Sequence, residues 1–163
     1  MSHIQELGAP ETALSQPEPI VLVRGMDDLA ALHAFVDALC EAVQLLEEER
    51  LTFRLAAEEA FTNIIVHGYD ADAVRARVEV RAYASDEEVG LELIDQGTPF
   101  DPASAPPADV KSGWEERPIG GVGWHLIREL TDRIRYRPNT PLGNRLMLVK
   151  RRTTTNETNQ EPT

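Results

Sequence analysis

The sequence has few of the features that mark a secreted or membrane protein. It contains a single cysteine, Cys40, so no disulfide can form within the chain, and this favours a reducing compartment. No apolar run approaches the roughly 20 residues that a membrane-spanning helix needs. The first residues have neither a basic patch nor an apolar stretch, so they do not resemble a signal peptide. These absences predict a cytoplasmic protein that makes no membrane contact.

The chain also has few basic residues for its number of acidic ones. Sixteen Lys and Arg residues stand against 28 Asp and Glu residues, which gives a formal net charge of −12. A surface of this sign repels phosphate backbones, so we expect no direct contact with nucleic acid. A bound nucleotide remains compatible with this charge, because backbone N–H groups and a metal ion act locally. The apolar fraction of 42% is high enough for a packed core.

Hydrophobic periodicity predicts one domain, at residues 19–150, between polar tails at 1–18 and 151–163. The predicted strands are 20–24, 74–84, 88–95, 133–137 and 145–150, and the predicted helices are 29–43, 47–67 and 124–130. Consecutive strands with short connections favour a mixed, mostly antiparallel sheet with all three helices on one face. The predicted fold class is therefore an α/β (α+β) two-layer sandwich.

The second predicted helix carries a stripe of polar residues. Glu59, Asn63 and His67 recur every four residues, so they share one face of the helix. An amide beside a carboxylate among apolar residues is costly unless a polar ligand, such as a hydrated cation, occupies the face. Taken alone, the stripe also fits a solvated face, and His67 also fits a helix C-terminus. Gly68 follows directly, where a residue in the left-handed conformation commonly ends a helix.

Asp95, Gln96 and Gly97 stand at the end of a predicted strand. A carboxylate fixed there can accept a hydrogen bond from an exocyclic amine such as that of adenine. The glycine lets the backbone pass close to a flat ring. The same residues also favour an ordinary turn, so this motif alone leaves both interpretations open.

A glycine-rich run, Gly120-Gly121-Val122-Gly123, lies directly before the third predicted helix. Backbone N–H groups at such a helix start can converge on phosphate oxygens, although a flexible entry to an ordinary helix also fits. The run is not a Walker loop, because no Gly-Lys-Ser/Thr follows it. It is not a dinucleotide fingerprint either, because the third glycine of the G-x-G-x-x-G pattern is missing and a proline-rich segment precedes the run. The four histidines and the cysteine have no zinc-site spacing.

Taken in order, the three segments resemble the ATP site of the gyrase, histidine-kinase and MutL (GHKL) superfamily, with its Bergerat-type fold. They resemble more closely the anti-sigma-factor serine/threonine kinases of bacteria. The segment EAFTNIIVHGY is similar to that family's N box, DQGTPFDP to its adenine-contacting box and ERPIGGVGWHLIREL to its phosphate-binding box. The closing segment DRIRYRPNTPLGNRLMLVK is also similar, so the resemblance covers about residues 18–150.

The resemblance implies a role for each matching residue. Asn63 would coordinate a Mg²⁺ ion that bridges the phosphates of ATP, and Glu59 would be the catalytic base. Asp95 would bind the adenine amine, with Gly97 beneath the ring.

The remaining matches concern the phosphates and the rim of the site. The phosphates would be cradled by Gly120, Gly121, Val122 and Gly123. Residues 100–119 would form a lid. Asn144, also expected at the nucleotide, stands where the family often has a threonine near the adenine, and Trp124 stands where a smaller aliphatic residue is common.

Family membership would also imply partners. The phosphate acceptor would be a STAS-domain anti-anti-sigma protein, the captive a sigma factor or similar regulator, and the chain a homodimer. Three alternatives remain at this point: a nucleotide-gated module that sequesters a regulator without transferring phosphate, a detached histidine-kinase catalytic domain, and a simple ATPase. Glu59, four residues before Asn63, favours hydroxyl chemistry over the histidine-kinase alternative.

Overall fold

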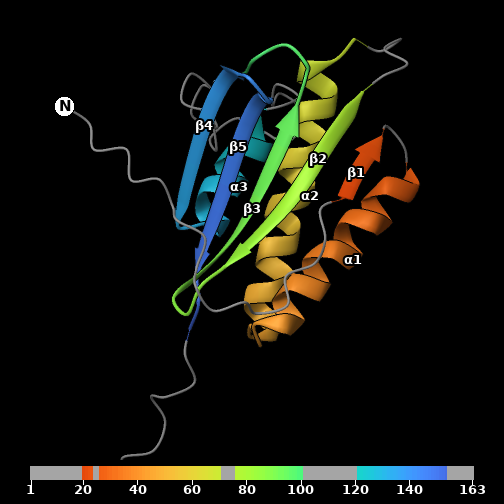
Figure 1. Cartoon of the computed structure of the whole chain (residues 1–163). Helices are drawn as coiled ribbons and strands as arrows, with labels where there is room; N and C mark the ends of the chain where they lie inside the picture. Colours follow the sequence, from red (N-terminus) through yellow and green to blue (C-terminus); the bar gives the residue numbers. More distant parts are fainter. Residues whose placement is uncertain (1–19, 24–25, 71–75, 101–120, 154–163) are drawn as a thin grey trace, which may run out of the picture.

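Alternating and helical apolar patterns produce eight elements in the part of the chain that the structure describes. A computed structural model describes residues 20–23, 26–70, 76–100 and 121–153. The elements follow in the order β1 (Ile20–Val23), α1 (Met26–Ala42), α2 (Glu47–Gly68), β2 (Arg77–Ala84), β3 (Glu88–Asp95), α3 (Gly121–Leu130), β4 (Arg133–Thr140) and β5 (Gly143–Arg151). This is the order that the sequence predicts (Figure 1).

The five strands form one sheet in the order β1-β2-β3-β5-β4. Each neighbouring pair in this described sheet is antiparallel. The register places Asp95, the last residue of β3, opposite Asn144 on β5 and opposite Val78 on β2. With the helices on one face of the sheet, the α+β two-layer class is confirmed (Figure 1).

The core lies between the helices and one face of the sheet. Along β2 every second side chain is buried, which is the pattern of a strand with one face on a core. α2 lies against this face, with α1 and α3 packed beside it (Figure 1). The largest fully buried side chains are Phe53, Leu32, Leu39, Leu91, Leu93, Ile127, Leu146, Leu148, Val36, Val78 and Val80. No helix of the described residues is long and apolar enough to cross a bilayer.

The opposite face of the sheet carries an ion pair whose carboxylate, Glu92, is buried and whose partner, Arg145, is partly exposed. Glu92 is only 3% exposed there, although charged residues are rarely buried. Its carboxylate accepts hydrogen bonds from the Tyr83 hydroxyl at 2.9 Å and from Arg145 Nε at 2.6 Å. Because both oxygens are paired, the desolvation of the charge is offset and the strand can keep its register.

Several element boundaries differ from the sequence prediction by a few residues. The expectation that Gly68 ends α2 in the left-handed conformation is wrong: Gly68 lies within the helix, which is capped by Tyr69 in an extended conformation. At the other end, the side chain of Arg152 donates to the carbonyls of Ser85 at 2.5 Å and Val43 at 2.6 Å. The chain therefore stays in contact with the domain through the last described residues, beyond position 150.

The core position of Phe53 gives a first test. Phe53→Ala should lower the free energy of unfolding by about 3–5 kcal/mol, because it leaves a cavity at a side chain that is fully buried. Leu51→Ala, on the same helix but 52% exposed, is the matched control and should change stability by about 0.5 kcal/mol or less. Equal effects of the two substitutions in urea denaturation would contradict this packing.

Candidate nucleotide-binding site

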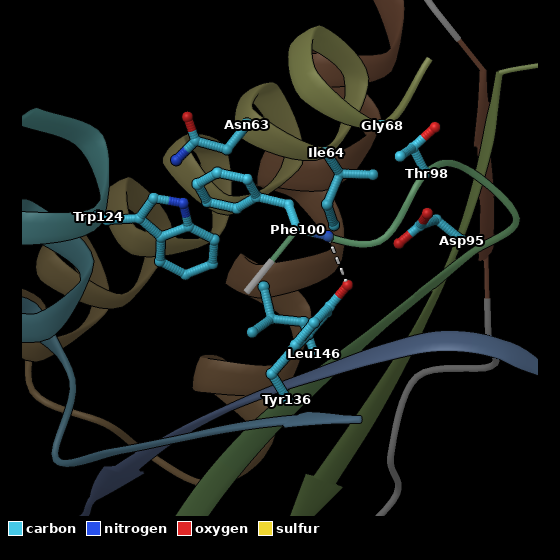
Figure 2. Close-up of a pocket in the computed structure, with 9 residues that line it drawn as sticks. All are labelled: Asn63, Ile64, Gly68, Asp95, Thr98, Phe100, Trp124, Tyr136 and Leu146. Atoms are coloured by element: carbon cyan, nitrogen blue, oxygen red, sulfur yellow. Dashed lines mark hydrogen bonds between the residues drawn. The ribbon is translucent and has the colours of Figure 1, made fainter. Parts of the chain in front are cut away.

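A pocket opens between α2, the first turn of α3 and the sheet ends that face them. Its lining residues are Asn63, Ile64, Gly68, Asp95, Thr98, Phe100, Trp124, Tyr136 and Leu146 (Figure 2). Asn63 comes from the polar stripe of α2, and Asp95 from the end of β3. The fold thus brings two of the residues singled out in the sequence to one cavity.

Gly97 allows the loop after β3 to touch the end of α2 at Gly68. A Cβ on Gly97 would lie only 2.8 Å from the carbonyl carbon of Gly68, which real Cβ atoms do not tolerate. Next to this contact the backbone N–H of Thr98 donates to the Gly68 carbonyl at 2.7 Å. The close approach therefore requires a glycine at position 97, whereas a Cβ on Gly68 would meet its neighbours at 3.7–3.8 Å, an ordinary contact distance.

Glu59 and Asn63 converge on α3. A Cβ on Gly123 would lie 2.9 Å from both Asn63 Nδ2 and Glu59 Oε2. Asn63 is 7% exposed, so the polar stripe faces the neighbouring helix here and is not a solvated face at this position. His67, the third member of the stripe, is exposed and stacks on Phe100 with ring centroids 5.3 Å apart.

The glycine-rich run belongs to α3 from Gly121 onward, although the sequence predicted that it would precede the helix. α3 begins at Gly121, three residues before the predicted start at Trp124. The first N–H groups of a helix have no partner within it, so those of Gly121, Val122 and Gly123 remain for other acceptors. Gly120 and residues 101–119 of the expected lid lie outside the described residues.

Two buried donors in the pocket have no acceptor among the described residues. They are Asn63 Nδ2 and Trp124 Nε1. In Figure 2 both nitrogen atoms lie on the sides of their side chains that face each other. Leaving such a donor unsatisfied costs about 1–3 kcal/mol, so a ligand group rich in acceptor oxygens fits this end of the pocket. A phosphate group has this chemistry.

At the other end of the pocket, Asp95 is a buried carboxylate, 4% exposed. Its Oδ1 accepts hydrogen bonds from Gly97 N at 2.8 Å and from Asn144 Nδ2 at 3.1 Å. Burial raises the pKa of the Asp95 carboxyl, while the hydrogen bonds from Asn144 and Gly97 act in the opposite direction. None of the described residues donates to Oδ2, which leaves this oxygen for a donor on a ligand.

The amino-acid sequence is similar to those of known proteins. A family model described as "Histidine kinase-like ATPase domain" matches residues 25–150. The chain belongs to this family of ATPase domains. The serine/threonine-protein kinase BtrW of Bordetella bronchiseptica is 28% identical to it over 87 residues, which cover 53% of this chain and 61% of BtrW. The match thus spans less than two thirds of that relative's length. Together, the two comparisons confirm the family suspected from the sequence, the anti-sigma-factor kinases within the histidine-kinase-like ATPases.

Membership in a family of ATPase domains implies that the chain binds ATP, and this pocket is the candidate site. The unpartnered donors and the start of α3 suit the phosphates, and Asp95 suits the base. A Mg²⁺ ion also fits the residues present, because Mg²⁺ keeps several waters and takes few protein ligands beside substrate phosphates. Asn63 could supply one such ligand. Among the described residues no group of three or more His, Cys, Asp or Glu side chains could hold a metal by itself.

The carboxyl of Glu59 lies beside Asn63 and Gly123, next to the pocket, and its pKa is shifted. Burial raises the pKa of Glu59, and the negative charge of Glu58 raises it further. Glu58 is held in turn by His33, whose Nε2 lies 2.7 Å from its Oε2. A carboxylate with a raised pKa is a better proton acceptor near neutral pH.

The aromatic lining of the ATPase site was not predicted from the sequence. Phe100 stacks on Trp124 with centroids 5.9 Å apart, and its backbone N–H donates to the Tyr136 hydroxyl at 2.9 Å. The alternation of RIRYR placed Tyr136 on the core side of its strand, which was a usable signal. No pattern in the sequence indicated that Phe100 would turn back onto α3.

Gly123 offers a test that separates folding from binding. Gly123→Ala should leave the thermal midpoint unchanged or raise it, because alanine favours a helix by about 1 kcal/mol over glycine. ATP affinity should fall at least about tenfold, since the new methyl group displaces the ends of Asn63 and Glu59. Gly90→Ala, in the middle of β3, is the control and should keep ATP affinity in calorimetry. An unaltered affinity in Gly123→Ala would contradict the convergence on α3.

Proposed function

We propose that this chain is an ATP-dependent serine/threonine protein kinase and anti-sigma factor, and that it phosphorylates a STAS-domain anti-anti-sigma protein. The main support is the convergence of Glu59 and Asn63 on the first turn of α3, at the end of the pocket away from Asp95. The similarity to a protein named as a serine/threonine kinase adds to it. A sigma factor or similar regulator would be the captive, held by a homodimer.

In this proposal each end of the pocket binds a different part of ATP. Asp95 Oδ2 accepts a hydrogen bond from the exocyclic amine of adenine, and Gly97 lies against the ring. The N–H groups of Gly121, Val122 and Gly123, with the buried donors of Asn63 and Trp124, bind phosphate oxygens. Mg²⁺ on Asn63 Oδ1 would supply further neutralisation of the triphosphate charge.

Glu59 receives a proton in the transfer step. The hydroxyl oxygen of a partner serine or threonine forms a bond to the γ-phosphorus of ATP, and the bond from that phosphorus to the β–γ bridging oxygen breaks. The hydroxyl proton passes to Glu59, and the products are ADP and the phosphorylated partner. Positioning and charge neutralisation dominate such transfers, while a general base contributes roughly 10²–10⁴-fold.

Glu59→Gln tests this assignment. The variant should bind ATP with the affinity of the wild type but lose transfer by at least about 10²-fold, because an amide cannot take the hydroxyl proton. The measurement is transfer of labelled γ-phosphate to a STAS-domain protein from the same cell, read as phosphoserine or phosphothreonine. Full transfer by the variant would contradict the role of Glu59. Tight ATP binding by the wild type without any transfer would instead support a nucleotide-gated switch.

Glu58→Gln is the matched control, one residue away and of the same chemistry. It should retain transfer, because Glu58 lies beside the base and takes no proton. Removing its negative charge lowers the pKa of Glu59, so Glu59 stays ionised to lower pH. The acid limb of the rate against pH should therefore move to lower pH, and an unmoved limb would contradict the coupling.

Asp95→Asn tests base recognition. ATP affinity should fall about tenfold or more, because a hydrogen bond to a charged acceptor contributes about 1.5–3 kcal/mol. The ligand-free variant should be the more stable protein at neutral pH. Burial raises the pKa of the Asp95 carboxyl in the folded state above its value in the unfolded chain. The contribution of Asp95 to the stability of the wild type is therefore fully present below the unfolded pKa and is lost as the pH rises through the folded pKa. Calorimetry and thermal unfolding at several pH values measure both effects, and unchanged ATP affinity would contradict the contact.

A further inference from the structure

Asn144 is fully engaged within the protein. It lies on β5 directly opposite Asp95 and is 3% exposed. Its Nδ2 donates to Asp95 Oδ1 at 3.1 Å and to the Gly97 carbonyl at 2.8 Å, and its Oδ1 accepts from Asn139 N at 3.1 Å. A side-chain amide has two N–H donors, and both are used here. No donor of Asn144 remains for a nucleotide.

We propose that Asn144 is a positioning residue for base selection: it holds Asp95 as an ionised acceptor with one oxygen open to an exocyclic amine, and does not touch the nucleotide itself. The substrate class that this arrangement selects is the adenine nucleotides. Guanine and hypoxanthine present a carbonyl acceptor at the same place on the ring. The inference rests on the proposed contact between Asp95 and the base.

The orientation of the Asn144 amide follows from its neighbours. The backbone N–H of Asn139 can only donate, so it requires the amide oxygen on its side. The Gly97 carbonyl can only accept, so it requires the NH₂ group on the opposite side. Asn139 is itself fixed in the left-handed conformation, with φ 53°. The turn between β4 and β5 thus determines which end of the amide faces Asp95.

This orientation determines which oxygen of Asp95 is open. Oδ1 receives the N–H groups of Asn144 and Gly97, which fixes the rotation of the carboxylate and leaves Oδ2. α2 faces this carboxylate with Gly68, which has no side chain. The nearby Tyr69 hydroxyl is already engaged, since it accepts from Gln96 N at 3.0 Å and donates to the Arg77 carbonyl at 2.9 Å.

The charge of Asp95 depends on the same two donors. Burial disfavours the ionised carboxylate and raises its pKa, and the groups that oppose this are the Asn144 amide and the Gly97 N–H. No charged side chain of the described residues contributes to the shift. A protonated Asp95 would present a hydroxyl donor, which suits the carbonyl of a hypoxanthine ring better than an amine. Asn144 therefore influences both the affinity for adenine and the discrimination between bases.

The experiment compares Asn144→Ala and Asn144→Asp with the wild type. The dissociation constants of ATP and ITP are measured by calorimetry from mildly acidic to mildly alkaline pH. Asn144→Ala should weaken ATP about tenfold at neutral pH, because Asp95 loses a donor. Losing that donor also raises the pKa of Asp95, so the fall in ATP affinity on acidification should begin at higher pH. The affinity for ITP should increase relative to the affinity for ATP as the pH falls.

Asn144→Asp should reverse the direction in which ATP affinity changes with pH. Two carboxylates at this distance cannot both ionise readily, so they share a proton at lower pH. The shared proton restores a hydrogen bond onto Asp95 Oδ1, and ATP affinity should improve as pH falls, opposite to the wild type. A residue that served only to pack the turn would not change the sign of this slope. Asn144→Ala leaves no second carboxylate beside Asp95 and Asn144→Asp leaves no cavity, so the two variants perturb folding in different ways, and thermal unfolding at each pH identifies the conditions in which each is folded.

Thr140→Val is the matched control in the same turn. It removes the hydrogen bonds that Thr140 Oγ1 makes with the Gly143 carbonyl at 2.7 Å and Leu142 N at 3.2 Å, and it touches neither Asp95 nor Asn144. Its ATP profile should follow the wild type. If the wild type binds ATP no better than Asp95→Asn, the proposed adenine contact fails. If binding depends on Asp95 but both Asn144 variants keep the wild-type pH profile, only the positioning role is overturned.

Discussion

The antiparallel register between β3 and β5 is the constraint on which the site depends. It sets Asp95 opposite Asn144 on the side of the sheet that faces the helices. Because strand side chains alternate between faces, a shift of one residue between the strands would place these two groups on opposite faces of the sheet. On the face away from the helices, the ion pair of Glu92 and Arg145 belongs to the same two strands and is matched to the same register. The two polar groups specify one alignment from both sides of the sheet.

Much of this arrangement could be predicted from the sequence, because it depends on local periodicity. The four-residue spacing of Glu59 and Asn63 placed them on one face of a helix, and the alternation EVGLELID placed Asp95 on the same row as the core leucines. The order of elements and the layer architecture followed from the same patterns. The roles of individual residues in catalysis and binding remain predictions.

The rest depends on contacts between segments that are distant in the chain. Gly68 carries no signal that distinguishes a left-handed helix end from a close approach to Gly97, since glycine suits both. The start of α3 was placed too late because glycines at 121 and 123 disfavour a helix locally, while packing against α2 stabilises it. The role of Asn144 was equally hidden, because it requires the carbonyl of Gly97 and the N–H of Asn139.

The unfilled donors of Asn63 and Trp124 have a consequence for the lifetime of the protein. If nucleotide phosphates accept hydrogen bonds from these donors, as proposed, binding removes their desolvation cost, and ligand binding and folding would be linked. A ligand at a hundred times its dissociation constant stabilises the folded state by about 2.7 kcal/mol. Unfolded chains are the substrates of cellular proteases, so depletion of nucleotide would increase the fraction open to degradation.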